Sequence, residues 1–235
     1  MKGIFITGTD TGVGKTVVCG LLAGFLRGRG IRAVTQKWVQ TGTRGEPSDL
    51  AEHRRLMGLP ASVPEEALAD LCPYRFSFPA SPRLAAALEG RRVEAPVIEA
   101  AYRRLAAAHE AVLVEGSGGI LVPLAEGVLT LDLVVRLGLS ALVVVGNRLG
   151  CVNHALLTVE EIRRREVPLA GLVFNRPPGD GGGAPENLLT DNLRVVEEIS
   201  KAPVLGEVPF LADPAAGAEA FAPVGRAFLE RWRPA

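Results

Sequence analysis

The sequence predicts an α/β fold of three layers, in which a mostly parallel sheet has helices on both faces. Strand-like and helix-like segments alternate along the chain, as they do in βαβ units. A glycine-rich loop joins the first strand-like segment, GIFITG at 3–8, to the first helix-like one. Later strand-like segments are continuous apolar runs, such as SALVVVGN at 140–147. Because such runs are typical of strands buried on both faces, we expect a parallel sheet.

The first helix is predicted from apolar residues at helical spacing. Val18, Leu21, Leu22 and Phe25 follow an i, i+3, i+4, i+7 pattern, and glycines at 28–30 mark the end of the helix.

The remaining elements are predicted from the same kinds of pattern. Residues 42–82 are expected to be irregular, with short helical pieces, because six prolines interrupt them. The tract 177–187, rich in glycine and proline, is expected to be a surface loop. The other predicted elements are a strand at 32–38, a helix at 95–109, strands at 111–116, 140–147, 169–175 and 202–209, and a helix near 216–232.

The composition is that of a globular protein without a strong charge. Of 235 residues, 48% are apolar and 22% are charged, and the formal net charge is zero. We therefore expect neither a nucleic acid nor an acidic membrane as a partner. No linker-like segment divides the chain, so residues 1–235 are expected to form one domain.

Cysteine usage and hydropathy indicate a cytoplasmic protein. Cys19, Cys72 and Cys151 lack the paired spacing of a disulfide framework or a zinc site. The segment after Met1 shows no signal-peptide pattern, and no apolar run reaches membrane-spanning length.

The stretch GTDTGVGKT, from Gly8 to Thr16, is a candidate phosphate loop. Its strand–loop–helix context predicts a fold of P-loop nucleoside triphosphatase type, in which loop amides and the helix N-terminus bind anions. Lys15 would reach the β- and γ-phosphates, and the Thr16 hydroxyl would bind Mg²⁺. The usual spacing would place the first glycine at position 9, where this chain has Thr9. The alternative is a glycine-rich turn that only caps the helix.

Three further charged residues are candidates for the same site. Glu115 follows a buried strand and precedes glycines, which suits a Mg²⁺ ligand, although a pair with a nearby arginine is the alternative. Asp49 could be a second metal ligand or a helix N-cap, and the local sequence favours the cap. Lys37 ends a strand, where it could stabilise charge in phosphoryl transfer or be a solvated lysine.

Five segments together resemble the dethiobiotin synthetase family and occur in that family's order. The resemblance covers the chain from Gly8 to about Leu211, and the five residues between Gly8 and Gly14 match the family's loop spacing. The segments are GTDTGVGKT (8–16), QKWVQTG (36–42), PYRFSFPASP (73–82), VEGSGG (114–119) and GCVNHALLT (150–158).

The resemblance implies an ATP- and Mg²⁺-dependent ligase that closes a cyclic urea. The substrates would be 7,8-diaminopelargonic acid and CO₂, supplied as bicarbonate. One amine would form a carbamate, ATP would phosphorylate it to a carbamic–phosphoric anhydride, and the second amine would displace phosphate. All these groups are anionic, so catalysis would depend on charge neutralisation and alignment.

The resemblance also implies roles for individual residues. Lys15 and Lys37 would be the catalytic cations, and Thr16, Asp49 and Glu115 would hold Mg²⁺. The expected ATP-binding residues are Gly12, Val13, Gly14, Lys15, Thr16, Val17, Asp49, Glu115, Gly116, Ser117, Gly118, Asn175, Arg176, Pro209, Phe210 and Leu211. The expected substrate-binding residues are Thr41, Gly118, Gly150, Cys151, Val152 and Asn153.

In this family the segment that matches 150–153 comes from a partner subunit, which implies a homodimer. The local sequence alone predicts that this segment is the start of a helix capped by Asn153. Two positions depart from the family pattern: Trp38 replaces the usual proline, and Gly12 replaces a carboxylate in the loop. Both departures concern the shape of the diamine pocket.

The main alternative is a partitioning or assembly-type regulatory ATPase switch with a related loop. Those proteins carry a signature lysine near the start of the loop, where this chain has Asp10. This reversal of charge disfavours the alternative.

Overall fold

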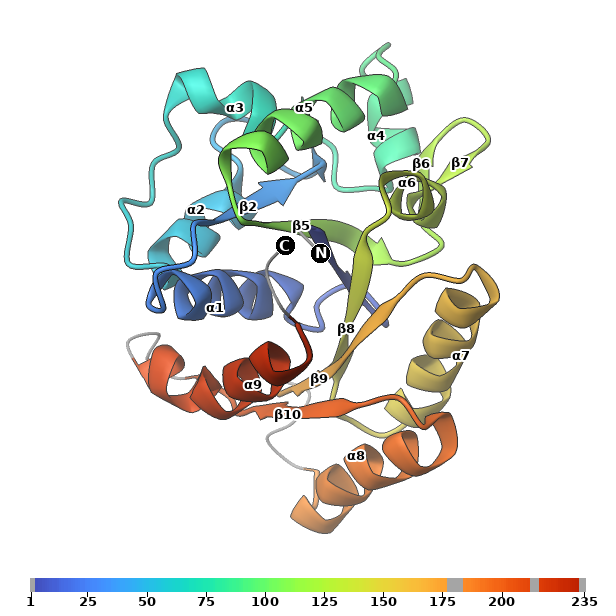
Figure 1. The fold of residues 1–235 in the computed structure, drawn as a ribbon. Coiled ribbons are helices and arrows are strands. Elements are labelled where there is room, and N and C mark those ends of the chain that lie inside the picture. Colours follow the sequence, from blue (N-terminus) through green and yellow to red (C-terminus); the bar gives the residue numbers. More distant parts are fainter. Residues whose placement is uncertain (1–2, 177–183, 212–215, 233–235) are drawn as a thin grey trace.

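The computed structural model describes residues 3–176, 184–211 and 216–232 (Figure 1). Within these residues, six parallel strands form the central sheet in the order β10-β9-β8-β1-β5-β2. The predicted three-layer, mostly parallel α/β fold is therefore confirmed. The strands are β1 (Gly3–Gly8), β2 (Ala33–Lys37), β5 (Ala111–Gly119), β8 (Ser140–Gly146), β9 (Leu169–Asn175) and β10 (Val204–Val208).

Helices cover both faces of this sheet, and each face has its own apolar core (Figure 1). Alternate residues of β1 pack into the two different cores, because successive side chains of a strand point to opposite faces of the sheet. Ile4 and Ile6 pack with helices α1 (Lys15–Arg27) and α9 (Gly217–Arg231). Phe5 belongs to the other core, which includes residues of α5 (Ala95–Ala108), α6 (Thr130–Leu137), α7 (Cys151–Arg164) and α8 (Glu186–Ser200).

Short elements surround the carboxyl end of the sheet near β2 and β5. Two small sheets pair β3 with β4 in parallel and β6 with β7 in antiparallel. The short elements are β3 (Val39–Gln40), α2 (Ser48–Leu56), α3 (Glu65–Leu71), β4 (Tyr74–Arg75), α4 (Pro82–Leu88), β6 (Pro123–Ala125) and β7 (Val128–Leu129).

Three expectations about local structure need correction. The strand expected at 111–116 continues to Gly119, because β1 pairs with it as far as Gly119. Helix α8 begins at Glu186, inside the loop expected at 177–187, whose residues 177–183 lie outside the described part of the chain. Helix α7 is capped by Gly150 in a left-handed conformation, and Asn153 is an exposed residue within the helix.

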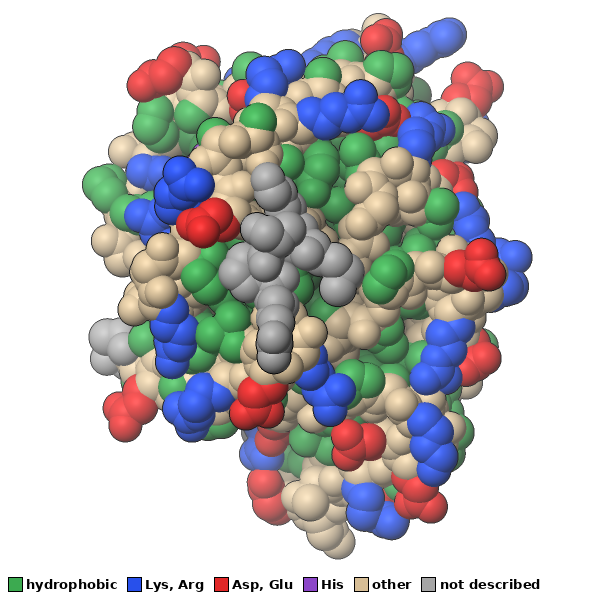
Figure 2. Space-filling model, viewed as in Figure 1, with side chains coloured by type: hydrophobic (Ala, Val, Ile, Leu, Met, Phe, Trp, Pro, Cys, Tyr) green, Lys and Arg blue, Asp and Glu red, His purple; other side chains and the backbone are tan. Residues whose placement is uncertain are grey.

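The surface and the cysteines agree with the composition. Side chains of both charge signs are interspersed over the face shown in Figure 2. All three cysteines are free and buried. Among the described residues, none of the helices combines the length and apolar character that crossing a membrane requires.

Candidate active site

The loop between β1 and α1 depends on two glycines. Gly12 and Gly14 have φ angles of 77° and 95°, in the left-handed region that favours glycine. A side chain at Gly14 would also collide with the amide of Asn175. That amide donates a hydrogen bond to the Val13 carbonyl at 2.9 Å, which ties the end of β9 to the loop. The two left-handed glycines and this hydrogen bond restrict the conformation of the loop backbone.

Lys15 is a buried cation at the start of α1. Its Nζ donates a hydrogen bond to the Asp10 carbonyl at 2.9 Å, and the residue is only 7% exposed. Burial lowers the pKa of Lys15 to about 8, and although Glu115 and Asp49 oppose this shift, the nearby Lys37 charge adds to it. Bound phosphate would stabilise the charged form of this lysine.

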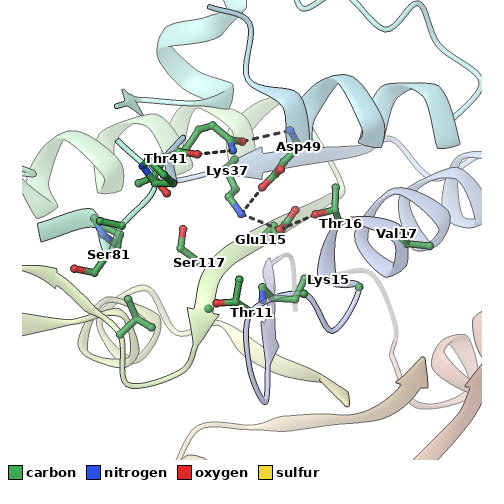
Figure 3. A pocket seen from close by; sticks show the side chains of 18 residues that line it. Thr11, Lys15, Thr16, Val17, Lys37, Thr41, Asp49, Ser81, Glu115 and Ser117 are labelled. Carbon is green, nitrogen blue, oxygen red and sulfur yellow. Dashed lines mark hydrogen bonds and ion pairs between the residues drawn. The ribbon is translucent and has the colours of Figure 1, made fainter. Parts of the chain in front are cut away.

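Lys37 and Glu115 face one another on neighbouring parallel strands. They are register partners of β2 and β5, so the fold places both at the same end of the sheet. Lys37 Nζ lies 2.8 Å from Glu115 Oε1 and 2.7 Å from Asp49 Oδ2 (Figure 3). It also donates to the Gly116 carbonyl at 3.1 Å, and Thr16 Oγ1 donates to Glu115 Oε1 at 3.1 Å.

Lys37 and Glu115 stabilise each other in their charged forms. Burial by itself lowers the pKa of Lys37, but Glu115 and Asp49 outweigh it and hold this pKa above its usual value. Burial likewise raises the pKa of Glu115, but the Lys37 charge and a hydrogen bond from His53 hold it well below its usual range. Lys37 is 4% exposed, so the alternative that it is a solvated lysine is wrong. The ion-pair partners of Glu115 among the described residues are Lys37 and His53, so the alternative of a pair with an arginine is also wrong.

Asp49 is a functional candidate rather than a helix cap. It is the second residue of α2, whose N-cap position is Pro47. Its backbone N–H donates to Gln40 Oε1 at 3.3 Å, and its carboxylate pairs with Lys37. The cap reading favoured by the local sequence is therefore wrong.

His53 is a site residue that sequence reasoning missed. It is fully buried, and its Nε2 lies 2.7 Å from Glu115 Oε2. The sequence feature that could have identified His53 is its position four residues after Asp49, because residues i and i+4 lie on the same face of a helix.

Lys15, Thr16, Lys37, Asp49 and Glu115 border one cavity of about 760 Å³ at the carboxyl end of β1, β2 and β5 (Figure 3), whereas His53 does not line it. The site residues that were expected from the sequence and that line this cavity are Gly12, Gly14, Lys15, Thr16, Val17, Lys37, Thr41, Asp49, Glu115, Ser117 and Gly118. Residues not assigned from the sequence also line it: Thr11, Gln40, Pro79, Ala80, Ser81, Pro82 and Val122.

The other expected site residues lie outside the lining of this cavity. Val13 and Gly116 are buried, and Arg176 pairs with Glu186 and Glu207, each at 2.6 Å. Phe210 is 54% exposed. The full set outside the lining is Val13, Gly116, Asn175, Arg176, Pro209, Phe210, Leu211, Gly150, Cys151, Val152 and Asn153.

The donor set around Lys37 fits a magnesium ion. Thr16, Asp49 and Glu115 offer only oxygen atoms, and Mg²⁺ prefers oxygen ligands. One oxygen of each carboxylate already lies within 2.8 Å of the Lys37 ammonium, so the two converge on positive charge. Among the described residues no three His, Cys, Asp or Glu side chains form a metal cage. Mg²⁺ is typically bound by one or two carboxylates together with substrate phosphates.

Comparison with known proteins identifies the family. A family model described as an AAA domain matches residues 2–216. The ATP-dependent dethiobiotin synthetase of Chlorobaculum tepidum is 42% identical over 215 residues, which cover 90% of this chain and 87% of that relative. The enzyme of the same name from Anaeromyxobacter dehalogenans is 50% identical over 190 residues, covering 80% and 82%. The chain belongs to the ATP-dependent dethiobiotin synthetase family.

Solved structures with low identity share the fold of this synthetase family member. The MinD cell division protein of Aquifex aeolicus aligns with a TM-score of 0.64 at 13% identity, covering 100% of this chain and 99% of that one. The cell division ATPase MinD of Pyrococcus furiosus gives 0.61 at 16%, covering 98% and 99%. The resemblance seen in the sequence and the expectation of an enzyme are confirmed, and these structures support the fold alone.

The two departures from the synthetase pattern have different surroundings. Trp38 is buried, its ring centroid 5.0 Å from that of Phe5, and its Nε1 donates to Gln36 Oε1 at 3.1 Å. It is therefore part of the core rather than a wall of the large cavity. Gly12 borders that cavity, and apart from its two chain neighbours no described residue lies within 4 Å of where its side chain would begin.

Proposed function

We propose that the chain converts 7,8-diaminopelargonic acid, CO₂ and ATP into dethiobiotin, ADP and phosphate. The observation that carries the proposal is the Lys37–Glu115–Asp49 cluster, which faces the phosphate loop across one cavity. Relatives that are 42% and 50% identical carry the corresponding name.

The reaction has three steps, all between groups that this cavity would hold. A neutral amine attacks CO₂ and loses a proton, which leaves a carbamate. A carbamate oxygen attacks the γ-phosphorus of ATP, and the bond to the β–γ bridging oxygen breaks to release ADP. The second amine then attacks the carbamoyl carbon of the mixed anhydride, closes the urea ring with loss of a proton, and expels phosphate.

The two lysines would stabilise the negative charge that these steps bring together. Lys15 and the loop amides between Gly12 and Thr16 would hold the β- and γ-phosphates. Lys37, which shares Glu115 Oε1 with Thr16 of the loop, would neutralise charge between carbamate and γ-phosphate. Thr41 and Gly118 line the same cavity and would contact the diamine.

Thr16, Asp49 and Glu115 would hold Mg²⁺. When bound, the ion supplies charge neutralisation on the nucleotide phosphates. The residues of the chain would set its position, since Thr16 already lies beside Glu115, its hydroxyl 3.1 Å from Oε1.

The nucleotide base is proposed to lie at the carboxyl ends of β9 and β10. Asn175 is the last residue of β9 and Arg176 follows it, and Pro209, Phe210 and Leu211 follow β10. Ligands of open α/β sheets bind at this end of the strands, which supports the placement.

The active assembly is proposed to be a homodimer of single-domain chains spanning residues 1–235. Gly150, Cys151, Val152 and Asn153 do not line the cavity of their own chain. A substrate contact from this segment would therefore come from a second copy. The cytoplasm is the proposed location, and three free cysteines suit a reducing compartment.

The test is whether ATP turnover depends on the diamine. Purified protein with Mg²⁺, bicarbonate and ATP should form dethiobiotin and ADP in equal amounts only when 7,8-diaminopelargonic acid is added. ATP turnover that is indifferent to the diamine would contradict the proposal and favour an assembly-type ATPase. Asp10 argues against that alternative, since its carboxylate pairs with Arg148 at 3.3 Å in the loop where the switch proteins carry a lysine.

A further inference from the structure

A buried histidine contacts the side of Glu115 that faces away from Thr16 and Lys37. His53 Nε2 lies 2.7 Å from Glu115 Oε2, and neither side chain is more than 2% exposed. Because the Glu115 carboxylate is ionised, it can only accept, so the His53 Nε2–H is the donor. His53 Nδ1 has no hydrogen-bond partner among the described residues. Within the described part of the chain, the contact with Glu115 is thus the one hydrogen bond of this imidazole.

The two oxygens of Glu115 therefore have separate partners. Oε1 accepts from Thr16 at 3.1 Å and from Lys37 at 2.8 Å, both of which line the cavity. Oε2 accepts from His53, which does not line it. A hydrogen bond to Oε2 restrains rotation of the carboxylate about its last torsion, which is otherwise soft.

The packing of α2 on α1 fixes His53 from behind. A side chain at Gly20 of α1 would begin 3.0 Å from His53 Cα and 2.9 Å from Leu56 Cβ. A side chain at Gly24 would begin 3.0 Å from the Leu56 carbonyl oxygen. The two glycines thus allow a close approach of the helices, which brings the imidazole within reach of Glu115 on β5.

We propose that His53 is a positioning residue, whose hydrogen bond holds Glu115 with Oε1 toward the phosphate loop for binding of Mg²⁺ and ATP. The inference rests on the proposed function, because it takes Glu115 as a metal ligand. Partners that orient metal ligands typically contribute 10–100-fold, as an order of magnitude, to metal affinity or activity. A histidine that serves only to fill the core would affect stability and leave the metal dependence unchanged.

The experiment compares His53→Leu, His53→Asn and His53→Gln with the unaltered protein. Calorimetry measures ATP affinity with Mg²⁺ and with EDTA, and electron paramagnetic resonance measures Mn²⁺ bound in the presence of ATP. His53→Leu, which lacks a donor, should weaken metal-dependent ATP binding by roughly 10–100-fold while affinity in EDTA stays the same. His53→Asn should lose as much, because its shorter amide does not reach Glu115. His53→Gln should recover most of the loss, because its amide nitrogen can replace Nε2.

Leu56→Ala is the matched control for packing. Leu56 lies in the same helix and packs against α1, but its hydrocarbon side chain cannot form a hydrogen bond to Glu115. It should lower the melting temperature with no change in the ratio of affinities with and without metal.

The outcomes separate the inference from the proposed function. The positioning role would be overturned if His53→Leu lost as much ATP affinity in EDTA as in Mg²⁺. It would also be overturned if His53→Gln lost as much metal-dependent ATP affinity as His53→Asn. If His53→Leu does not fold, the comparison of His53→Asn with His53→Gln decides by the same criterion. Unaltered protein whose ATP binding ignores metal would instead contradict the proposed function itself.

Discussion

Lys37 and Lys15 show how two similar side chains acquire different properties in one cavity. Lys37 has two carboxylate partners within 2.8 Å, which keep it charged despite its burial. Lys15 has a carbonyl as its hydrogen-bond partner, and burial lowers its pKa to about 8. Lys15 is therefore the cation whose charge depends on what binds beside it.

Binding of ATP should weaken as the pH rises above about 8. Phosphate favours the charged form of Lys15 and raises its pKa, so at higher pH the lysine must take up a proton when ATP binds. The affinity should fall by up to about tenfold per pH unit between the free and bound pKa values. Calorimetry between pH 7 and pH 9.5, in buffers of different ionisation enthalpy, measures both the affinity and the proton uptake.

The matched variant is Lys15→Arg, whose guanidinium stays charged over this range and should show no such slope or proton uptake. A flat affinity profile for the unaltered protein would show that Lys15 does not titrate in this window.

At the scale of elements, two pairings assemble the charge cluster. The parallel register of β2 and β5 sets Lys37 beside Glu115. The close packing of α1 and α2 brings Asp49 and His53 over the same strands, since α2 carries both residues on one face. The site therefore depends on a helix contact as much as on the loop.

Gly20→Val should destabilise the protein through that helix contact. The new side chain would begin within 2.9 Å of Leu56 and 3.0 Å of the His53 backbone. Overpacking of this kind costs roughly 1–3 kcal/mol of unfolding free energy. Urea denaturation measures the change. Gly28→Ala, at the end of the same helix with its nearest atom at 3.5 Å, should change stability by no more than about 0.5 kcal/mol. Equal changes in unfolding free energy for the two variants would show that α1 and α2 can move apart without loss of stability.

At the scale of the whole molecule, the large cavity takes its lining from the phosphate loop, the ends of β2 and β5, and the segment 79–82. The start of α7 at Gly150 lies outside that lining, although the family resemblance assigns it to the substrate. A dimer that brings α7 of one copy to the cavity of another would reconcile the position of α7 with that expectation.

Mixing two inactive variants should restore activity if the site is shared between copies. Lys37→Ala and Asn153→Ala would each be expected to be nearly inactive alone. After unfolding and refolding together, mixed dimers of a two-fold assembly would each contain one intact site, giving about a quarter of unaltered activity. Dethiobiotin formation measures the recovery, and each variant refolded alone is the control. No recovery from dimers shown to have exchanged would contradict a shared site.

Most of the architecture could be predicted from the sequence, whereas part of the site could not. Val-rich runs predicted buried parallel strands correctly, because burial on both faces requires continuous apolar residues. The predicted end of β5 was too early, at Gly116 instead of Gly119, because a glycine-rich segment is typical of a loop. In the structure β5 continues through these residues, and β1 pairs with it as far as Gly119. Asp49 was first read as a cap because local sequence carries no information about Lys37, which is twelve residues away. His53 was missed for the same reason.

By itself, the sequence determined the α/β class, the phosphate loop and, through five ordered segments, the synthetase family. These features are local, since hydrophobic periodicity and residue spacing can be read within one segment. Only the tertiary structure decided that Lys37 and His53 contact different oxygens of Glu115, and that Asp49 pairs with the same Lys37 ammonium. The physical reason is that strand register and helix packing bring together side chains far apart in the chain, where burial then makes their charges depend on one another.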